Sequence, residues 1–115
     1  LDEISISGRT LVGELKDGRI SEYEIHPEEF NLPVHDPKVL QVSNVEESKA
    51  MLLGALDNKL GAARDIVALN AGASIYVAGR ADTLADGVDK AFEAIASGAA
   101  RAKMDEFVNY TKRFA

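Results

Sequence analysis

The alternation of hydrophobic and polar positions changes once along the chain, from a period of two near the start to a helical period afterwards. Residues 4–7 read Ile-Ser-Ile-Ser, the pattern of a half-buried strand. Two further short runs, 10–15 and 20–25, flank an Asp17-Gly18 pair, which suits the positive φ angles of a two-residue hairpin turn. The pattern therefore predicts an antiparallel meander of three strands within about residues 3–25.

A connection without a regular period follows over residues 26–43. It opens with Pro27, which is tolerated in the first turn of a helix and predicts one helical turn over 26–30. Pro33 and Pro37 then favour irregular structure. A connection of this length is either a surface excursion or a functional loop, and the sequence leaves both open.

The remainder has a helical period and predicts four helices, over about residues 44–58, 62–79, 83–97 and 99–113. Ser43 and Glu46 match a capping box at the start of the first helix. We expect the second helix to end at Gly79 in a left-handed cap, and Ser97-Gly98 to separate the last two helices.

The stretch from Asp65 to Gly79 is apolar on nearly every face, so we expect a core helix that is buried on all sides. It is too short, and too closely flanked by charge, to span a bilayer. Asn70 is its most informative polar residue, because an unpartnered buried amide costs about 1–3 kcal/mol. We therefore expect Asn70 to bond a neighbouring backbone and to tie a loop end to the core.

Strands followed by helices in 115 residues indicate one α+β unit, or the tail end of a larger α/β sheet. A formal charge of −6 and a pI near 4.8 argue against nucleic acid or an anionic membrane as a partner. The chain has no cysteine, which excludes disulfides and thiolate metal sites. It shows no leader-like segment or long apolar run, and we expect a soluble, cytoplasmic protein.

Few residues suggest chemistry by themselves. No phosphate-binding glycine loop and no serine, histidine and acid triad with recognisable spacing is present. His26 and His35 are interpreted as surface loop residues, with a ligand or base as the alternative. Asp2 and Glu3 are adjacent carboxylates just before a predicted strand, and Mg²⁺ commonly uses one or two carboxylates together with water and substrate phosphates. Alone, an Asp-Glu pair is a weak motif.

Eight segments together carry a stronger signal than any of them alone. The chain resembles the C-terminal third of the anthranilate phosphoribosyltransferase family, and the resemblance extends over essentially all of it. The matching segments are Leu-Asp-Glu-Ile at 1–4, Leu-Val-Gly-Glu-Leu-Lys-Asp-Gly at 11–18, Glu-Glu-Phe-Asn-Leu-Pro at 28–33, Asn44 to Leu56, Gly-Ala-Ala-Arg-Asp at 61–65, Leu-Asn-Ala at 69–71, Thr-Leu-Ala-Asp-Gly at 83–87 and Ser-Gly-Ala-Ala at 97–100.

The resemblance implies a function and a parent fold. Members of the family transfer the 5-phosphoribosyl group of phosphoribosyl pyrophosphate to anthranilate in tryptophan biosynthesis and release pyrophosphate. They combine a small helical domain with a larger α/β domain of the nucleoside phosphorylase type, and they are usually homodimers. An Asp-Glu pair in the family's Gly-Leu-Asp-Glu motif helps to bind a second Mg²⁺ on the diphosphate. Asp2 and Glu3 match that pair, and no other site residue of the family can be carried over.

The chain also departs from the family. The glycine-rich Gly-Thr-Gly-Gly-Asp loop, the Lys-His-Gly and Asn-x-Ser-Thr segments, the anthranilate-contacting arginine and the dimer-forming helical domain would all lie upstream of Leu1. We therefore expect a piece of the enzyme that is inactive alone. Two alternatives stay open: a paralogue of the same fold without anthranilate activity, and a self-contained, non-catalytic α+β interaction module.

Overall fold

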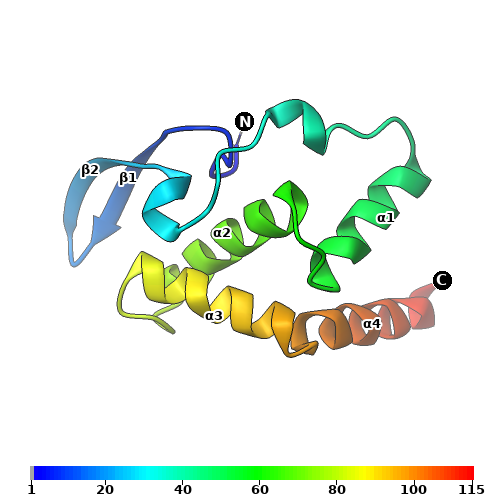
Figure 1. The fold of residues 1–115 in the computed structure, drawn as a ribbon. Coiled ribbons are helices and arrows are strands. Elements are labelled where there is room, and N and C mark those ends of the chain that lie inside the picture. Colours follow the sequence, from blue (N-terminus) through cyan, green and yellow to red (C-terminus); the bar gives the residue numbers. More distant parts are fainter. Residues whose placement is uncertain (1) are drawn as a thin grey trace.

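The computed structural model describes residues 2–115; Leu1, the first residue of the Leu-Asp-Glu-Ile match, lies outside the described part. A β-hairpin comes first, two short 3₁₀ helices follow, and four α-helices complete the chain (Figure 1). The elements are β1 (Thr10–Lys16), β2 (Arg19–Ile25), η1 (Pro27–Phe30), η2 (Pro37–Leu40), α1 (Val45–Leu56), α2 (Ala62–Val77), α3 (Leu84–Ala96), α4 (Ala99–Thr111) and η3 (Lys112–Phe114). The four predicted helices are thus present.

The two strands form an antiparallel hairpin whose register runs from Thr10 opposite Ile25 to Lys16 opposite Arg19. Its turn consists of Asp17 and Gly18, with φ angles of 52° and 75°. Positive φ at both central residues is typical of a type I′ turn, which matches the twist of the strands in a two-residue hairpin. The predicted hairpin and its turn are confirmed.

The predicted third strand is wrong, because residues 4–7 belong to no sheet in the described chain. Their backbone is bonded to side chains instead: the Ser5 N–H donates to Thr10 Oγ1 at 3.0 Å, and the Ser7 N–H donates to Ser5 Oγ at 3.0 Å. Such local bonds compete with a strand ladder for the same donors. The alternating pattern of residues 4–7 still predicts which side chain is buried, since Ile6 is only 1% exposed.

Both residues of the predicted capping box, Ser43 and Glu46, are also wrong by one position. Asn44, not Ser43, caps α1, and its Oδ1 accepts from the Glu47 N–H at 2.9 Å. The Glu47 carboxylate in turn accepts from the Ser43 N–H at 2.8 Å. Asparagine caps a helix as well as serine does, so neighbouring cap residues in a sequence leave the start uncertain by one position.

Glycine ends the second helix as predicted. Gly79 has a φ of 73°, and the Arg80 N–H donates to the Ile75 carbonyl at 3.0 Å. The Gly79 N–H donates to the Tyr76 carbonyl at 3.0 Å. These two bonds make a Schellman motif, which satisfies carbonyls that the end of the helix would otherwise leave without partners.

Helices α2 and α3 form the centre of the molecule and approach each other through two glycines. A Cβ atom on Gly87 would lie 2.2 Å from the Gly72 carbonyl oxygen, and one on Gly72 would lie 2.5 Å from the Val88 Cα. The main core cluster beside this crossing joins four parts of the chain: its buried members are Ile6, Leu32, Leu69 and Val88.

The expectation that the second helix is buried on all sides is wrong. One face of α2 is buried, and it consists of Ala62, Asp65, Ala68, Leu69 and Gly72. On the other side Val77 is 83% exposed, and Val67 is exposed as well. The physical reason is coverage, because the elements packed against α2 within residues 2–115, chiefly α3 and α1, leave Val67 and Val77 uncovered (Figure 1).

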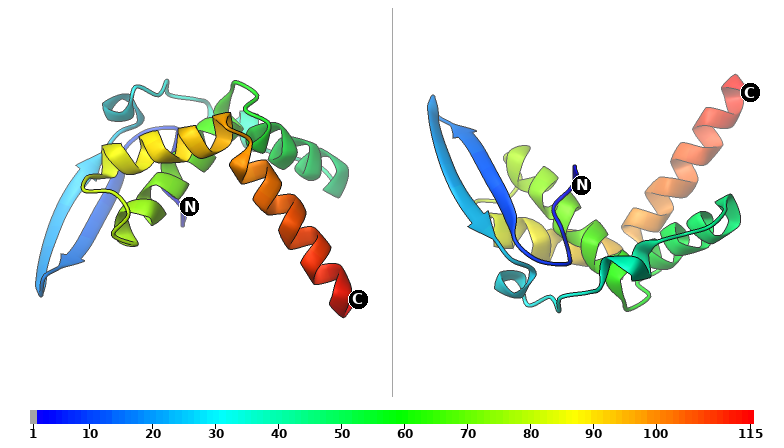
Figure 2. Two further views of the ribbon diagram at one scale, coloured as in Figure 1. Left: turned by 90° about the horizontal axis from the view of Figure 1, so that it is seen from below. Right: turned by 90° about the horizontal axis from the view of Figure 1, so that it is seen from above.

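The molecule is elongated, with extents of 43 × 31 × 25 Å. The hairpin projects at one end, and α1 and α4 extend from the other end of the central pair (Figure 2). No residue of α4 is buried. Within residues 2–115, no helix combines the length and the apolar character that crossing a membrane requires.

Candidate functional site

Asp2 and Glu3 lie at the start of the described chain, and both are exposed. No hydrogen bond or ion pair within residues 2–115 involves either carboxylate, and no group of three or more potential metal-binding side chains occurs in this range. Their oxygens are the donors that a hard cation such as Mg²⁺ prefers. Adjacent exposed carboxylates of this kind suit a Mg²⁺ ion that also binds water and a phosphate-bearing substrate.

Asn70 lies on α2 directly beside the backbone that follows this pair. Its Oδ1 accepts from the Ile4 N–H at 2.9 Å, and its Nδ2 donates to the Ile4 carbonyl at 3.0 Å. The same Nδ2 donates to the Ile66 carbonyl, one helical turn earlier, at 3.0 Å. The amide therefore uses its acceptor and both donor hydrogens, and it joins positions 66 residues apart.

The segment that Asn70 holds is also anchored by its neighbours. Ile6 inserts into the core between α2 and α3, and its carbonyl accepts from the His35 N–H at 3.1 Å. The loop that follows η1 therefore packs on the N-terminal segment. In Figures 1 and 2 this segment (dark blue) passes close to α2, with the loop beside it.

The two histidines do not form a common site. His26 caps η1, its Nδ1 accepting from the Glu28 N–H at 3.4 Å. His35 is not a simple surface residue, because its Nε2 lies 3.0 Å from Asp65 Oδ2. The other oxygen of Asp65 accepts from Arg64 Nη2 at 3.0 Å. This arrangement closes the loop onto the first turn of α2 and leaves neither histidine in a metal-binding group within the described chain.

A second polar cluster joins the hairpin to α2. Both oxygens of the Glu14 carboxylate accept from tyrosines, at 2.5 Å from Tyr76 Oη and 2.8 Å from Tyr23 Oη. The two bonds, Tyr76 first, lower the pKa of Glu14 because they favour its charged form. Burial, and then the bond to Glu14, raise the pKa of Tyr23 to about 12. Lys16 also lies over the Tyr76 ring.

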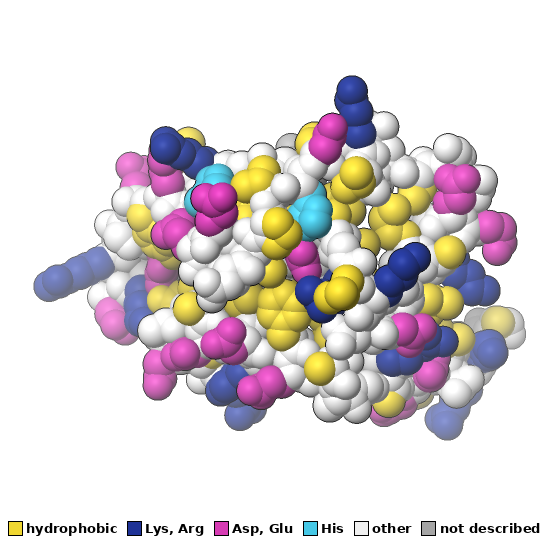
Figure 3. Space-filling model, in the orientation of Figure 1, with side chains coloured by type: hydrophobic (Ala, Val, Ile, Leu, Met, Phe, Trp, Pro, Cys, Tyr) yellow, Lys and Arg dark blue, Asp and Glu magenta, His cyan; other side chains and the backbone are white. Residues whose placement is uncertain are grey.

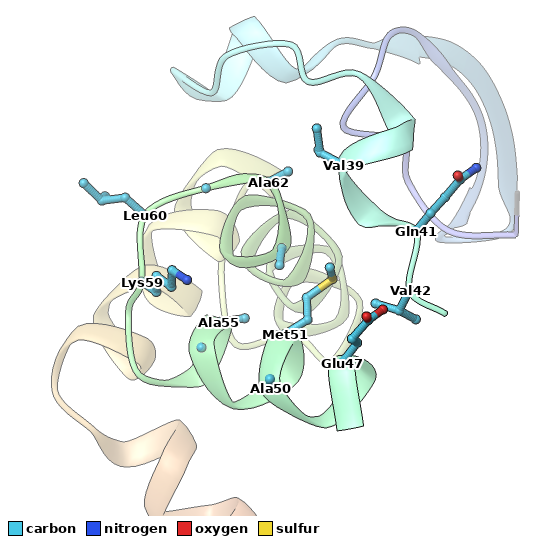
Figure 4. A pocket seen from close by; sticks show the side chains of 13 residues that line it. Val39, Gln41, Val42, Glu47, Ala50, Met51, Ala55, Lys59, Leu60 and Ala62 are labelled. Atoms are coloured by element: carbon cyan, nitrogen blue, oxygen red, sulfur yellow. The ribbon is translucent and has the colours of Figure 1, made fainter. Parts of the chain in front are cut away.

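A groove of about 450 Å³ lies between η2, α1 and the first turn of α2. In Figure 4, Met51 points from α1 toward the start of α2, whereas Leu60 points away from the groove. Hydrophobic side chains gather in this hollow, beside α1 in Figure 3. The lining contains one carboxylate, Glu47, which already bonds the Ser43 N–H, so the groove has the composition of a packing surface and not of a catalytic centre.

Comparison with known proteins defines the class. Residues 1–101 match the sequence model of the family described as "Glycosyl transferase family, a/b domain". The chain therefore belongs to this glycosyl transferase family.

Individual relatives carry a more specific name. Anthranilate phosphoribosyltransferases of Burkholderia ambifaria and Burkholderia multivorans are 57% and 58% identical to this chain over 114 residues. The alignment covers 99% of this chain and 33% of each relative. The crystal structure of anthranilate phosphoribosyltransferase (TrpD) from Thermus thermophilus superposes with a TM-score of 0.85 and 32% identity, over 97% of this chain and 33% of that one. The chain thus spans about a third of the length of these relatives.

Sequence reasoning missed the contacts of two side chains. The sequence marks Asp65 only as a charge beside a hydrophobic stretch, although it is the buried partner of His35 and Arg64. Its partner His35 lies 30 residues away in an irregular loop, so no local spacing indicates the pair. The acceptor role of Glu14 is hidden for the same reason, because Tyr76 lies 62 residues away.

Proposed function

We propose that the chain is the C-terminal third of an enzyme that transfers the 5-phosphoribosyl group of phosphoribosyl pyrophosphate to the amino group of anthranilate, with release of pyrophosphate. One observation carries the proposal: relatives named anthranilate phosphoribosyltransferase are 57% identical to this chain over nearly its whole length. The reaction belongs to tryptophan biosynthesis, and we place it in the cytoplasm.

Within that enzyme, the proposed role of this chain is to hold Mg²⁺ through Asp2 and Glu3. A bound Mg²⁺ supplies positive charge that offsets the charge building on the departing diphosphate. The adjacent carboxylates offer oxygen donors on an exposed segment, which leaves space for a substrate. The helices α2 and α3 form the rigid support behind the segment, and we assign no catalytic residue to them.

Other parts of the proposal concern regions outside this chain. The phosphate-binding loop, the anthranilate contacts and the helical domain that forms a homodimer are expected in the upstream part of the enzyme. Several apolar side chains on the hairpin and on α4 are exposed here, which is consistent with a chain that has further protein against it.

The activity test uses the full-length protein and this 115-residue chain in parallel. We expect the full-length protein to consume fluorescent anthranilate in the presence of phosphoribosyl pyrophosphate and Mg²⁺, and the 115-residue chain to show no turnover. Turnover by the short chain would contradict the assignment of the phosphate loop to the upstream part. A full-length protein that releases pyrophosphate only with another acceptor would be a paralogue.

A full-length protein that consists of these 115 residues alone and binds no phosphoribosyl pyrophosphate would support the other alternative, a self-contained interaction module. Determining the coding sequence upstream of Leu1 distinguishes this case without any assay, since the proposed enzyme requires a glycine-rich phosphate loop there.

A further inference from the structure

We propose that Asn70 is a positioning residue for the Asp2–Glu3 carboxylate pair. The inference rests on the proposed function, because it takes the pair as Mg²⁺ ligands. It adds a residue on another element, and this residue contacts neither the metal nor the substrate.

Asn70 contacts Ile4 through two hydrogen bonds. Asn70 holds both the N–H and the carbonyl of Ile4, at 2.9 and 3.0 Å. Two bonds to one residue restrict rotation of the segment as well as its distance from α2. The third bond of the amide, to the Ile66 carbonyl, fixes the orientation of the amide on its own helix.

Asp2 and Glu3 lie close to Ile4 along the chain. Glu3 directly precedes Ile4, and Asp2 is one residue further, so at most roughly 7 Å of extended backbone separates the tether from the pair. On the other side of Ile4, Ile6 is buried in the core and the Ser5 N–H donates to Thr10 Oγ1. The anchored backbone therefore ends at Ile4, and the two carboxylates are the first side chains beyond it.

Anchoring at Ile4 has a consequence for ligation. A carboxylate that binds a cation loses the rotational freedom of its side chain and of its backbone. If the backbone is already held in one orientation, less freedom remains to be lost, and binding is tighter. Changing residues that orient metal ligands typically weakens metal affinity roughly 10–100-fold. Asn70 meets the geometric requirement for such a residue, although it acts through the main chain.

The experiment uses the full-length protein with three variants. Asn70→Leu keeps the approximate volume and removes all three bonds. Asn70→Asp keeps an acceptor for the Ile4 N–H but cannot donate to the Ile4 carbonyl, so it gives a partial loss in case the leucine variant does not fold. Ile95→Val is the matched control, because it removes a methylene group from the other core cluster, which does not include Ile4.

Two readouts separate positioning from stability. Mg²⁺ affinity is measured by calorimetric titration in the presence of phosphoribosyl pyrophosphate without anthranilate, and hydrogen exchange is followed at residues 4–7. We expect Asn70→Leu to speed exchange of this segment and to weaken Mg²⁺ binding about tenfold. Ile95→Val should lower the unfolding temperature while leaving Mg²⁺ affinity unchanged.

Faster exchange with wild-type Mg²⁺ affinity in both Asn70 variants would overturn the proposal and leave Asn70 a purely structural tether. Failure of the underlying site has a different signature. If Asp2 and Glu3 do not bind Mg²⁺, then Asp2→Asn combined with Glu3→Gln would also leave Mg²⁺ affinity unchanged. If only the role of Asn70 is wrong, this double substitution would still weaken Mg²⁺ binding.

Discussion

At the scale of single residues, Asp65 is the one charged side chain that is buried within residues 2–115, at 3% exposed. Asp65→Ala removes the shared partner of His35 and Arg64, both of which are largely buried. We expect a loss of about 2–4 kcal/mol in the free energy of unfolding, measured by urea titration. Asp89→Ala, at an exposed position on α3, is the control and should change stability by less than about 0.5 kcal/mol. An equal loss of unfolding free energy in Asp65→Ala and Asp89→Ala would contradict the role given to Asp65.

Tyr23 gives a prediction at high pH. Its pKa is raised to about 12, first by burial and then by its bond to Glu14. A raised pKa means that folding favours the protonated phenol, so this contribution is complete below pH 10 and is lost as the pH rises toward 12. Tyrosinate absorbance in the ultraviolet should show a late step that Tyr23→Phe abolishes. Glu14→Gln should move the step to lower pH, and an unmoved step would contradict the bond.

At the scale of elements, the contact between α2 and α3 depends on Gly72 and Gly87. Alanine at either position places a methyl group within 2.5 Å of backbone atoms of the other helix, so the two helices must move apart. We expect a net loss of about 1–3 kcal/mol, because overpacking outweighs the gain in helix propensity. Gly54→Ala on α1 is the matched control. Its methyl group would meet only Lys59, with the nearest atom, Cδ, at 3.5 Å, so thermal unfolding should show a small gain in stability.

Elements with local determinants could be predicted from the sequence. The hairpin turn at Asp17-Gly18, the cap at Gly79 and the four helices each follow from residues within a few positions of one another. The prediction of a third strand failed because the backbone of residues 4 and 5 bonds the side chains of Asn70 and Thr10, and Asn70 lies 66 residues from Ile4. The prediction that α2 is buried on all sides failed because a sequence shows how apolar a helix is but not which elements cover it.

At the scale of the whole molecule, one face of the hairpin exposes three large aliphatic side chains beside Glu22 and Glu24. Leu15 and Ile20 are paired across the strands and are 72% and 77% exposed, with Leu11 on the same face. A chain with such a surface is prone to associate. We expect concentration-dependent association of the 115-residue chain in sedimentation velocity, and a shift toward monomer in Leu15→Lys combined with Ile20→Lys. A monomer at all concentrations would contradict this expectation.

For the candidate site, the expectation that Asn70 binds a neighbouring backbone is confirmed by its two bonds to Ile4, although the sequence did not indicate which segment it holds. Asp2 and Glu3 are singled out by the sequence because adjacent carboxylates suit Mg²⁺ and because they match a family motif. The anchoring of the segment behind them requires the three-dimensional contacts of Asn70, Ile6 and His35, which come from separate parts of the chain.

The central claim for this chain is that its first carboxylates bind the Mg²⁺ of a phosphoribosyl transfer. The most direct measurement is the Mg²⁺ dependence of turnover in the full-length protein carrying Asp2→Asn and Glu3→Gln together. Both side chains are exposed, so the unfolding temperature should stay within error of wild type. We expect half-maximal turnover to require more Mg²⁺ and the maximal rate to fall. A Mg²⁺ titration curve that superimposes on the wild-type curve would contradict the claim.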